Sequence, residues 1–99
     1  MKLEELDDFL MCLGGNDVWF SLGRRRYLAN GAQCEFDELG RTIDAILEVY
    51  ELDEDDSIAG TVYAVTRPSP QECVAAFIRE FKLDGKSFFE LRKRIKWRK

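Results

Sequence analysis

The chain has 99 residues, of which 45% are hydrophobic, 12% aromatic and 34% charged. This length supports one hydrophobic core, so we expect a single α+β domain over residues 1–99, and the apolar content is too high for a disordered chain. No stretch reaches the roughly 18 apolar residues of a membrane-spanning helix, and the N-terminus lacks the apolar core of a secretory signal. These features predict a cytoplasmic protein without membrane contact.

Histidine is absent, and the three cysteines, Cys12, Cys34 and Cys73, form no C-x-x-C pair. Such an odd set fits neither a disulfide framework nor a zinc site, so we interpret the cysteines as free thiols in or near the core. Without histidine, the commonest general base and the usual partner of a Ser or Cys nucleophile are missing. The sequence therefore predicts a non-enzymatic protein with no cofactor and no metal.

One segment has the spacing of calcium ligands. Asp53, Asp55 and Ser57 match the first three ligands of an EF-hand loop. However, Ile58 stands where that loop needs glycine, and Ala64 stands where it needs a bidentate glutamate. An EF-hand is therefore excluded.

The N-terminal third predicts a helix followed by a hairpin. Residues 2–13 carry leucines at helical spacing and acidic side chains on the other face. The Gly-Gly-Asn sequence at 14–16 ends this helix. Val18–Leu22 alternates in the manner of a strand, and residues 25–29 are predicted to return as its hairpin partner, closed by a turn at 30–31.

The middle of the chain allows two interpretations. Residues 36–50 place apolar side chains on one side of a helix and charged ones on the other, which favours a helix, although Gly40 lowers helix propensity by about 1 kcal/mol. The alternative is a strand over 42–52 that pairs with 61–66 across the acidic loop 53–57, as the β-branched content allows. Residues 61–66 are apolar on both faces and predict a central strand.

Residues 69–72 give the strongest local signal: Ser as N-cap, Pro at the first helical position, and Glu three residues after the cap. The helix that begins there is predicted to end at residues 84–85. Residues 87–90 repeat the capping-box spacing and favour a final helix, but apolar residues between 89 and 97 also fit a strand. The predicted fold is thus α+β, with three to four helices packed on a short antiparallel or mixed sheet.

Charge is distributed unevenly along the chain. Residues 1–78 hold 16 acidic and 6 basic side chains, a net −10, whereas residues 79–99 hold 3 acidic and 9 basic, a net +6. The predicted partner-binding residues, here called the acidic strip, are Asp37, Glu38, Asp44, Glu48, Glu51, Asp53, Glu54, Asp55 and Asp56. A solvated surface explains such a run, but clustered like charge also steers the encounter with a basic partner.

The leading functional hypothesis is a protein-binding module of the small acidic inhibitor, immunity or antagonist type. Its acidic strip would dock on the basic surface of another protein. The alternative is a nucleic-acid-binding regulator, in which cations contact phosphates and an aromatic ring stacks on a base. Its candidate residues are Arg92, Lys93, Arg94, Lys96, Trp97 and Arg98. A simpler interpretation of this basic segment is that it packs against the acidic body of the same molecule.

Overall fold

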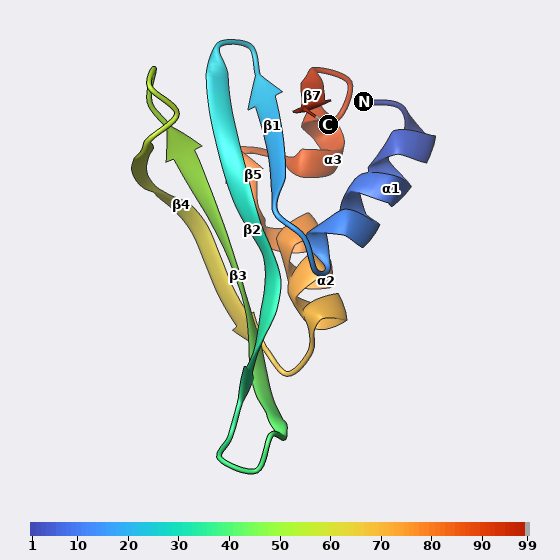
Figure 1. The fold of residues 1–99 in the computed structure, drawn as a ribbon. Coiled ribbons are helices and arrows are strands. Elements are labelled where there is room, and N and C mark those ends of the chain that lie inside the picture. Colours follow the sequence, from blue (N-terminus) through green and yellow to red (C-terminus); the bar gives the residue numbers. More distant parts are fainter. Residues whose placement is uncertain (99) are drawn as a thin grey trace.

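The protein consists of one large antiparallel sheet with helices on one side. The computed structural model describes residues 1–98 (Figure 1). The elements in chain order are α1 (Leu3–Leu13), β1 (Val18–Leu22), β2 (Arg25–Phe36), β3 (Thr42–Leu52), β4 (Ile58–Arg67), α2 (Pro70–Glu80), β5 (Lys82–Leu83), β6 (Lys86–Ser87), α3 (Phe88–Leu91) and β7 (Ile95–Arg98). The strand order is β4-β3-β2-β1-β7, and β5 and β6 form a separate small hairpin.

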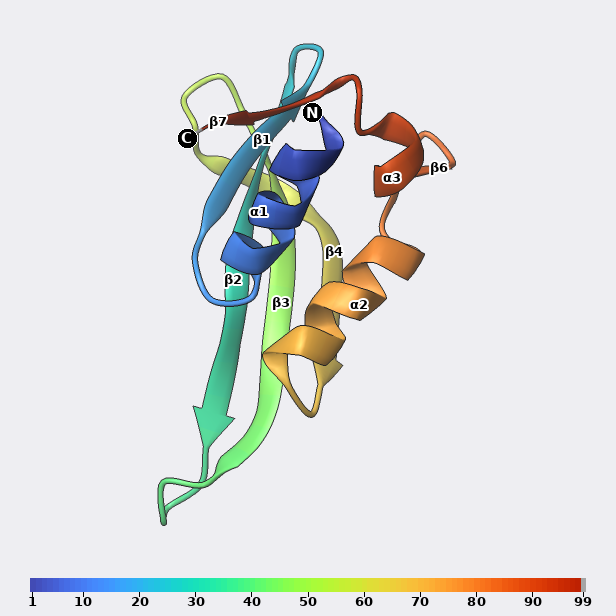
Figure 2. The same cartoon turned by 90° about the vertical axis from the view of Figure 1, so that its right-hand side faces the viewer.

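Both long helices cover the same face of the sheet. In Figures 1 and 2, α1 lies over the β1–β2 side and α2 over the β3–β4 side, while the opposite face carries no helix. Strand β7 brings the C-terminal segment back beside β1, where the amino group of Met1 donates to the carbonyl oxygens of Arg92 (2.6 Å) and Ile95 (3.0 Å). The two ends of the chain therefore close one side of the molecule.

The core between sheet and helices is rich in aromatic rings. Phe9 of α1 stacks on Phe88 at 5.1 Å between ring centroids, and Phe77 of α2 stacks on Phe81 at 4.8 Å. Phe20 of β1 contacts both groups edge-on. All five rings are buried to 0–1% exposure, and edge-to-face and offset contacts of this kind add about 0.5–1.5 kcal/mol each beyond area burial.

The prediction of three to four helices on a short sheet is wrong, because residues 42–52 are strand β3 and not a helix. The alternative strand over 42–52, paired with 61–66, is confirmed. Segment 42–52 forms a strand because β2 does not stop at residues 30–31. It continues to Phe36 and pairs with β3 along its length, so β3 has hydrogen-bonded neighbours on both sides.

Gly31, predicted as part of a turn, instead sits at an irregularity in β2, between Asn30 and Gln33. A Cβ at Gly31 would lie 2.3 Å from the backbone nitrogen and oxygen of Asn16. Glycine is therefore needed here for the close approach of two chain segments and not for a turn.

Three other features of the fold differ from the predictions. The final helix α3 is a single turn, and the segment after it forms strand β7, so each interpretation of this segment is right over part of its length. Helix α2 ends at Glu80 and not at 84–85, which form the β5–β6 turn. Strand β4 lies at the edge of the sheet and not in its centre.

The local helix signals are confirmed. Helix α1 and the β1–β2 hairpin form where predicted. Ser69 caps α2 by accepting from the backbone N–H of Glu72 at 3.2 Å. Ser87 and Glu90 form the predicted reciprocal capping box, in which the Ser87 hydroxyl oxygen accepts from the Glu90 backbone N–H and the Glu90 carboxylate accepts from the Ser87 backbone N–H. Hydrogen bonds from the Ser87 backbone, first of all, and from its side chain hold the pKa of the Glu90 carboxyl below the ordinary value.

Candidate functional site

The open face of the sheet carries a row of side chains that the fold leaves without a covering layer. Trp19, Leu28 and Tyr50 lie in register on β1, β2 and β3, and each alternates along its strand with residues of the core or its margin. We call these three the apolar row. Arg98 of β7 and Thr61 of β4 continue it to the two edges of the sheet. Because in-register neighbours on one face contact each other, the row forms a continuous band across the sheet.

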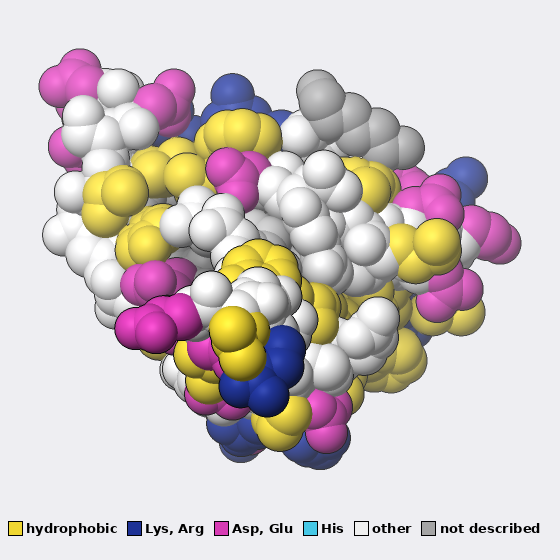
Figure 3. Space-filling view, turned by 60° about the horizontal axis from the view of Figure 1, so that its bottom comes forward, with side chains coloured by type: hydrophobic (Ala, Val, Ile, Leu, Met, Phe, Trp, Pro, Cys, Tyr) yellow, Lys and Arg dark blue, Asp and Glu magenta, His cyan; other side chains and the backbone are white. Residues whose placement is uncertain are grey.

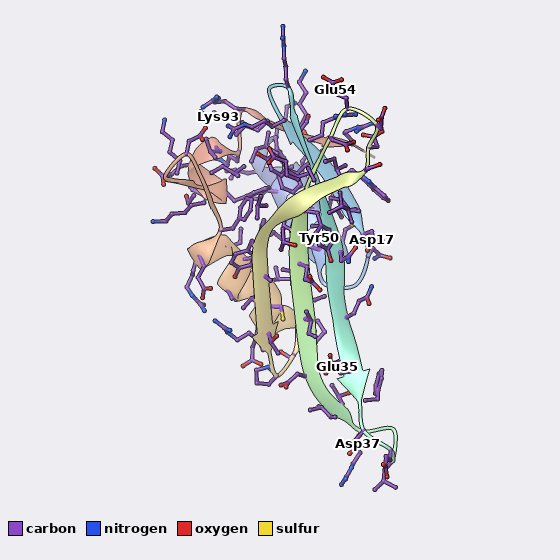
Figure 4. All side chains as sticks on the ribbon, turned by 90° about the vertical axis from the view of Figure 1, so that its left-hand side faces the viewer. Asp17, Glu35, Asp37, Tyr50, Glu54 and Lys93 are labelled. Atoms are coloured by element: carbon purple, nitrogen blue, oxygen red, sulfur yellow. The ribbon has the colours of Figure 1, made fainter. Side chains whose placement is uncertain are left out.

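Tyr50 lies near the middle of this face, as Figure 4 shows, with Asp17 beside it. Its hydroxyl oxygen accepts from the side-chain amide of Asn30 at 3.2 Å and interacts with the carboxylate of Glu48. Burial raises the pKa of Tyr50, and the hydrogen bond and negative charge of Glu48 raise it further. The ring is thus held in place as a neutral hydrogen-bonding group among carboxylates.

The structure divides the acidic strip among four places. Asp44 and Glu48 belong to the open face, since they alternate with the buried Ala45, Leu47 and Val49. The β2–β3 turn and the β3–β4 turn hold six further members at opposite ends of the sheet, as the labels on the two turns in Figure 4 show: Asp37, Glu38, Asp53, Glu54, Asp55 and Asp56. Glu51 is separate from both groups. It pairs in register with the buried Tyr27 and so lies on the helix-covered side of the sheet margin.

Several of the turn carboxylates have a structural role. Asp37 accepts from the backbone N–H groups of Leu39 and Arg41, both at 2.9 Å, and from the Arg41 side chain at 2.8 Å. These bonds, first of all that to the Arg41 backbone, lower the pKa of the Asp37 carboxyl. Asp53 likewise accepts from two backbone N–H groups in the β3–β4 turn, and Asp56 pairs with Arg26. These three side chains hold turns together, which leaves the other members of the strip for contact with a partner.

A feature that sequence reasoning missed lies at the end of the β2–β3 hairpin. The hairpin tip, which we define as residues 36–43, exposes Phe36, Leu39 and Ile43, with Leu39 at 77% exposure. In Figure 3, where this end of the molecule comes forward, hydrophobic side chains lie next to basic and acidic ones. A helical interpretation of this segment hides the tip, because it places Phe36, Leu39 and Ile43 on the buried side of the helix.

The basic C-terminal segment does not form one surface. Trp97 packs toward the core, with its ring edge-on to Phe9 at 5.6 Å, so this ring is not presented to solvent as a stacking platform. Arg92 lies over the ring of Phe89 at 4.2 Å. Lys96 and Arg98 project from the other side of β7 beside Ser21 and Trp19 in register. Within residues 1–98 no ion pair joins this segment to the acidic body.

Inside the described part of the chain, no group of three or more Cys, Asp or Glu side chains is arranged to hold a metal ion. Cys73 is buried, Cys12 and Cys34 are partly buried, and no helix in the same range is long and apolar enough to cross a membrane. Comparison of the chain with models of protein families, with curated proteins and with solved structures finds no match. The open face, with its apolar row, its carboxylates and the adjoining hairpin tip, is therefore the candidate site on structural grounds alone.

Proposed function

We propose that this protein is a binding module that uses the open face of its sheet to cover a basic surface on another protein, in the manner of a small acidic antagonist. The observation that carries the proposal is the apolar row beside Asp44 and Glu48 on a face without a covering layer. Trp and Tyr are the residues most enriched among binding hot spots, and a polar rim around such anchors is the usual anatomy of an interface.

Charge sets the kind of partner. Within residues 1–98, neither Asp44 nor Glu48 is held in an ion pair, and the same is true of Glu38, Glu54 and Asp55 in the turns. Lys96 and Arg98 lie at the β7 edge of this face, so the acidic part is the β3 side, with Asp44 and Glu48. An acidic partner would meet like charge there, whereas a basic one would be steered to it. At its far end, the hairpin tip adds the exposed Phe36, which pairs in register with Thr42 on this face.

A comparison of capture by matched variants tests the proposal. The face variant is Trp19→Ala with Tyr50→Ala, and the control is Met11→Ala with Phe89→Ala, which truncates two exposed apolar side chains that lie off this face. We expect the immobilised wild type and the control to retain a basic protein from a lysate. The amount retained by the face variant should be at least about tenfold lower, as for loss of hot-spot residues. Equal retention by all three would contradict the proposal.

A second function remains as the alternative, now with different residues. Trp19 is 42% exposed and lies in register with Arg98, and Lys96 lies across from Ser21 on the same face. We propose these residues, in place of Trp97, as the site for a single-stranded nucleic acid. Titration with a fluorescent oligonucleotide at about 50 and 200 mM salt tests it, because phosphate contacts predict a steep loss of affinity over this range. Absence of binding at the lower salt would exclude it.

A further inference from the structure

The two edges of the large sheet are protected very differently. At one edge, β7 has only four residues, and two of them, Lys96 and Arg98, are exposed and charged. At the other edge, β4 has ten residues, of which seven are exposed, and it carries no charge from Ile58 to Thr66. Natural proteins protect edge strands by short length or by charge, because an open edge pairs with other strands. Strand β4 has neither of these two protections, although irregularities in its pairing with β3, a further form of protection, interrupt it.

We propose that β4 pairs antiparallel with β4 of a second copy of this chain, so that the two sheets join into one of ten strands. The proposal is independent of the binding function of the open face, because an edge and a face are different surfaces. Residues 61–66 are β-branched, aromatic or small, which suits strand pairing. Since this stretch is uncharged, two identical strands meet without like-charge repulsion.

Charge complementarity favours a second copy over an unrelated strand. The acidic β3–β4 turn, with Glu54 and Asp55, precedes β4, and Arg67 ends it. An antiparallel pair centred on the middle of β4 places the acidic turn of each copy near Arg67 of the other.

Two irregularities limit the strength of this pairing. The register between β3 and β4 shifts near Val62 and near Ala59, and only the portion from Tyr63 to Arg67 is regular. Bulges of this kind bend an edge strand, so we expect a small interface and a dimer that dissociates on dilution. The predicted behaviour is a monomer–dimer equilibrium in the micromolar range and not a permanent dimer.

Sedimentation velocity between about 5 and 500 µM tests the proposal, a range that covers weak interfaces of this size. Two edge variants place opposite charges on exposed β4 positions that flank the two-fold axis: Ala64→Lys and Thr61→Glu. Each should raise the dissociation constant at least about tenfold, because each puts like charges near the two-fold axis. A general effect of net charge would change the dissociation constants of the two variants in opposite directions. An increase in both therefore identifies the β4 edge as the interface.

Met11→Lys is the matched control, since Met11 is 80% exposed on α1, away from β4. It should dimerise as the wild type does. Thermal melts check that all variants fold, and amide exchange should show protection of β4, but not of β7, rising with protein concentration. A monomer at every concentration overturns the proposal. A dimer that both edge variants leave unchanged, or a β4 edge protected only by a strand from another protein, overturns it as well.

Discussion

The two faces of the large sheet carry similar side chains in very different surroundings. On the helix-covered face, Phe20 and Tyr27 stack at 5.1 Å and are fully buried. On the open face, Trp19 and Tyr50 occupy the neighbouring strand positions and remain partly exposed. The covered face accounts for folding, since apolar burial is its main favourable term. The proposed binding function predicts that the apolar row on the open face adds less to folding than the covered face does.

The largest expected effect comes from truncating a ring on the covered face. Phe20→Ala removes a ring with four aromatic neighbours, Phe9, Tyr27, Phe81 and Phe88. We expect a loss of about 3–5 kcal/mol in the free energy of unfolding. Trp19→Ala, one position away, should cost only about 1 kcal/mol or less, the range for cross-strand pairs. Urea denaturation measures both. Similar losses would mean that the open face also serves mainly for stability.

The next largest loss of stability is expected where β2 lies against the segment that precedes β1. Gly31→Ala puts a Cβ within 2.3 Å of the Asn16 backbone, which cannot move aside as a side chain does. Forced overpacking of this kind costs about 1–3 kcal/mol, and we expect the upper end. Gly60→Ala is the control, because nothing lies within 4 Å of the position that its Cβ would take. Its expected change in denaturation midpoint is small, and a matching loss in both variants would contradict the close approach.

The contrast between Gly31 and Ser69 shows what the sequence could predict. A cap such as Ser69 acts on the next three residues, so the sequence alone places the start of α2. The role of Gly31 depends on Asn16, fifteen positions away and brought near only by the fold. The helix prediction for segment 42–52 is wrong for the same reason, namely that a distant part of the chain determines the structure. The pattern of this segment suits both a helix and a strand, and pairing with β2 selects the strand.

The candidate site, like the fold, was predictable only in its local features. Composition identifies the carboxylates of the acidic strip, but it does not show that Asp37 and Asp53 hold turns while Asp44 and Glu48 face outward. The alternation of Trp19 with buried neighbours is visible in the sequence. Its partners in the apolar row come from β2 and β3, so their alignment required the sheet register.

An intermediate effect is expected at the start of α2. Ser69→Ala removes the bond from the Glu72 backbone N–H and should lower the free energy of unfolding by about 1 kcal/mol. A glutamate three residues after the cap completes a capping box when its carboxylate accepts from the cap backbone N–H, but here the Glu72 carboxylate accepts from the Ser69 hydroxyl at 3.0 Å. Thermal melts of Ser69→Ala beside Ser69→Asn, which keeps a capping oxygen, measure this contribution. A loss of the same size in both would show that capping is not its cause.

A smaller, local effect should appear in the hairpin tip at acid pH. The pKa of Asp37 is lowered by its bonds to Arg41 and Leu39, so its contribution to tip order is present at neutral pH and is lost as pH falls through the folded value. The amide resonances of Leu39 and Arg41 should therefore change only below the ordinary carboxyl range of about pH 4. In Asp37→Asn they should no longer follow a carboxyl titration. Resonances independent of pH in the wild type would contradict the role of Asp37.

The smallest effect on stability, and the most informative for function, is expected from charge reversal on the open face. Asp44→Lys with Glu48→Lys changes partly exposed side chains that carry no ion pair within residues 1–98. Exposed charges contribute about 0–1 kcal/mol, so the melting temperature should shift little. Association with the basic partner should slow, and its dependence on salt should weaken, because charges near an interface act chiefly on encounter.

The comparison for that experiment is Glu54→Lys with Asp55→Lys in the β3–β4 turn. Asp53 is kept in this variant, because its carboxylate accepts two backbone hydrogen bonds that hold the turn, and its replacement would mix folding with binding. If the open face is the binding surface, the Asp44 and Glu48 pair slows association more than the turn pair does, although both change the net charge equally. Equal slowing by the two variants would mean that the partner responds only to total charge, and wild-type rates in both would exclude the acidic strip as the binding surface.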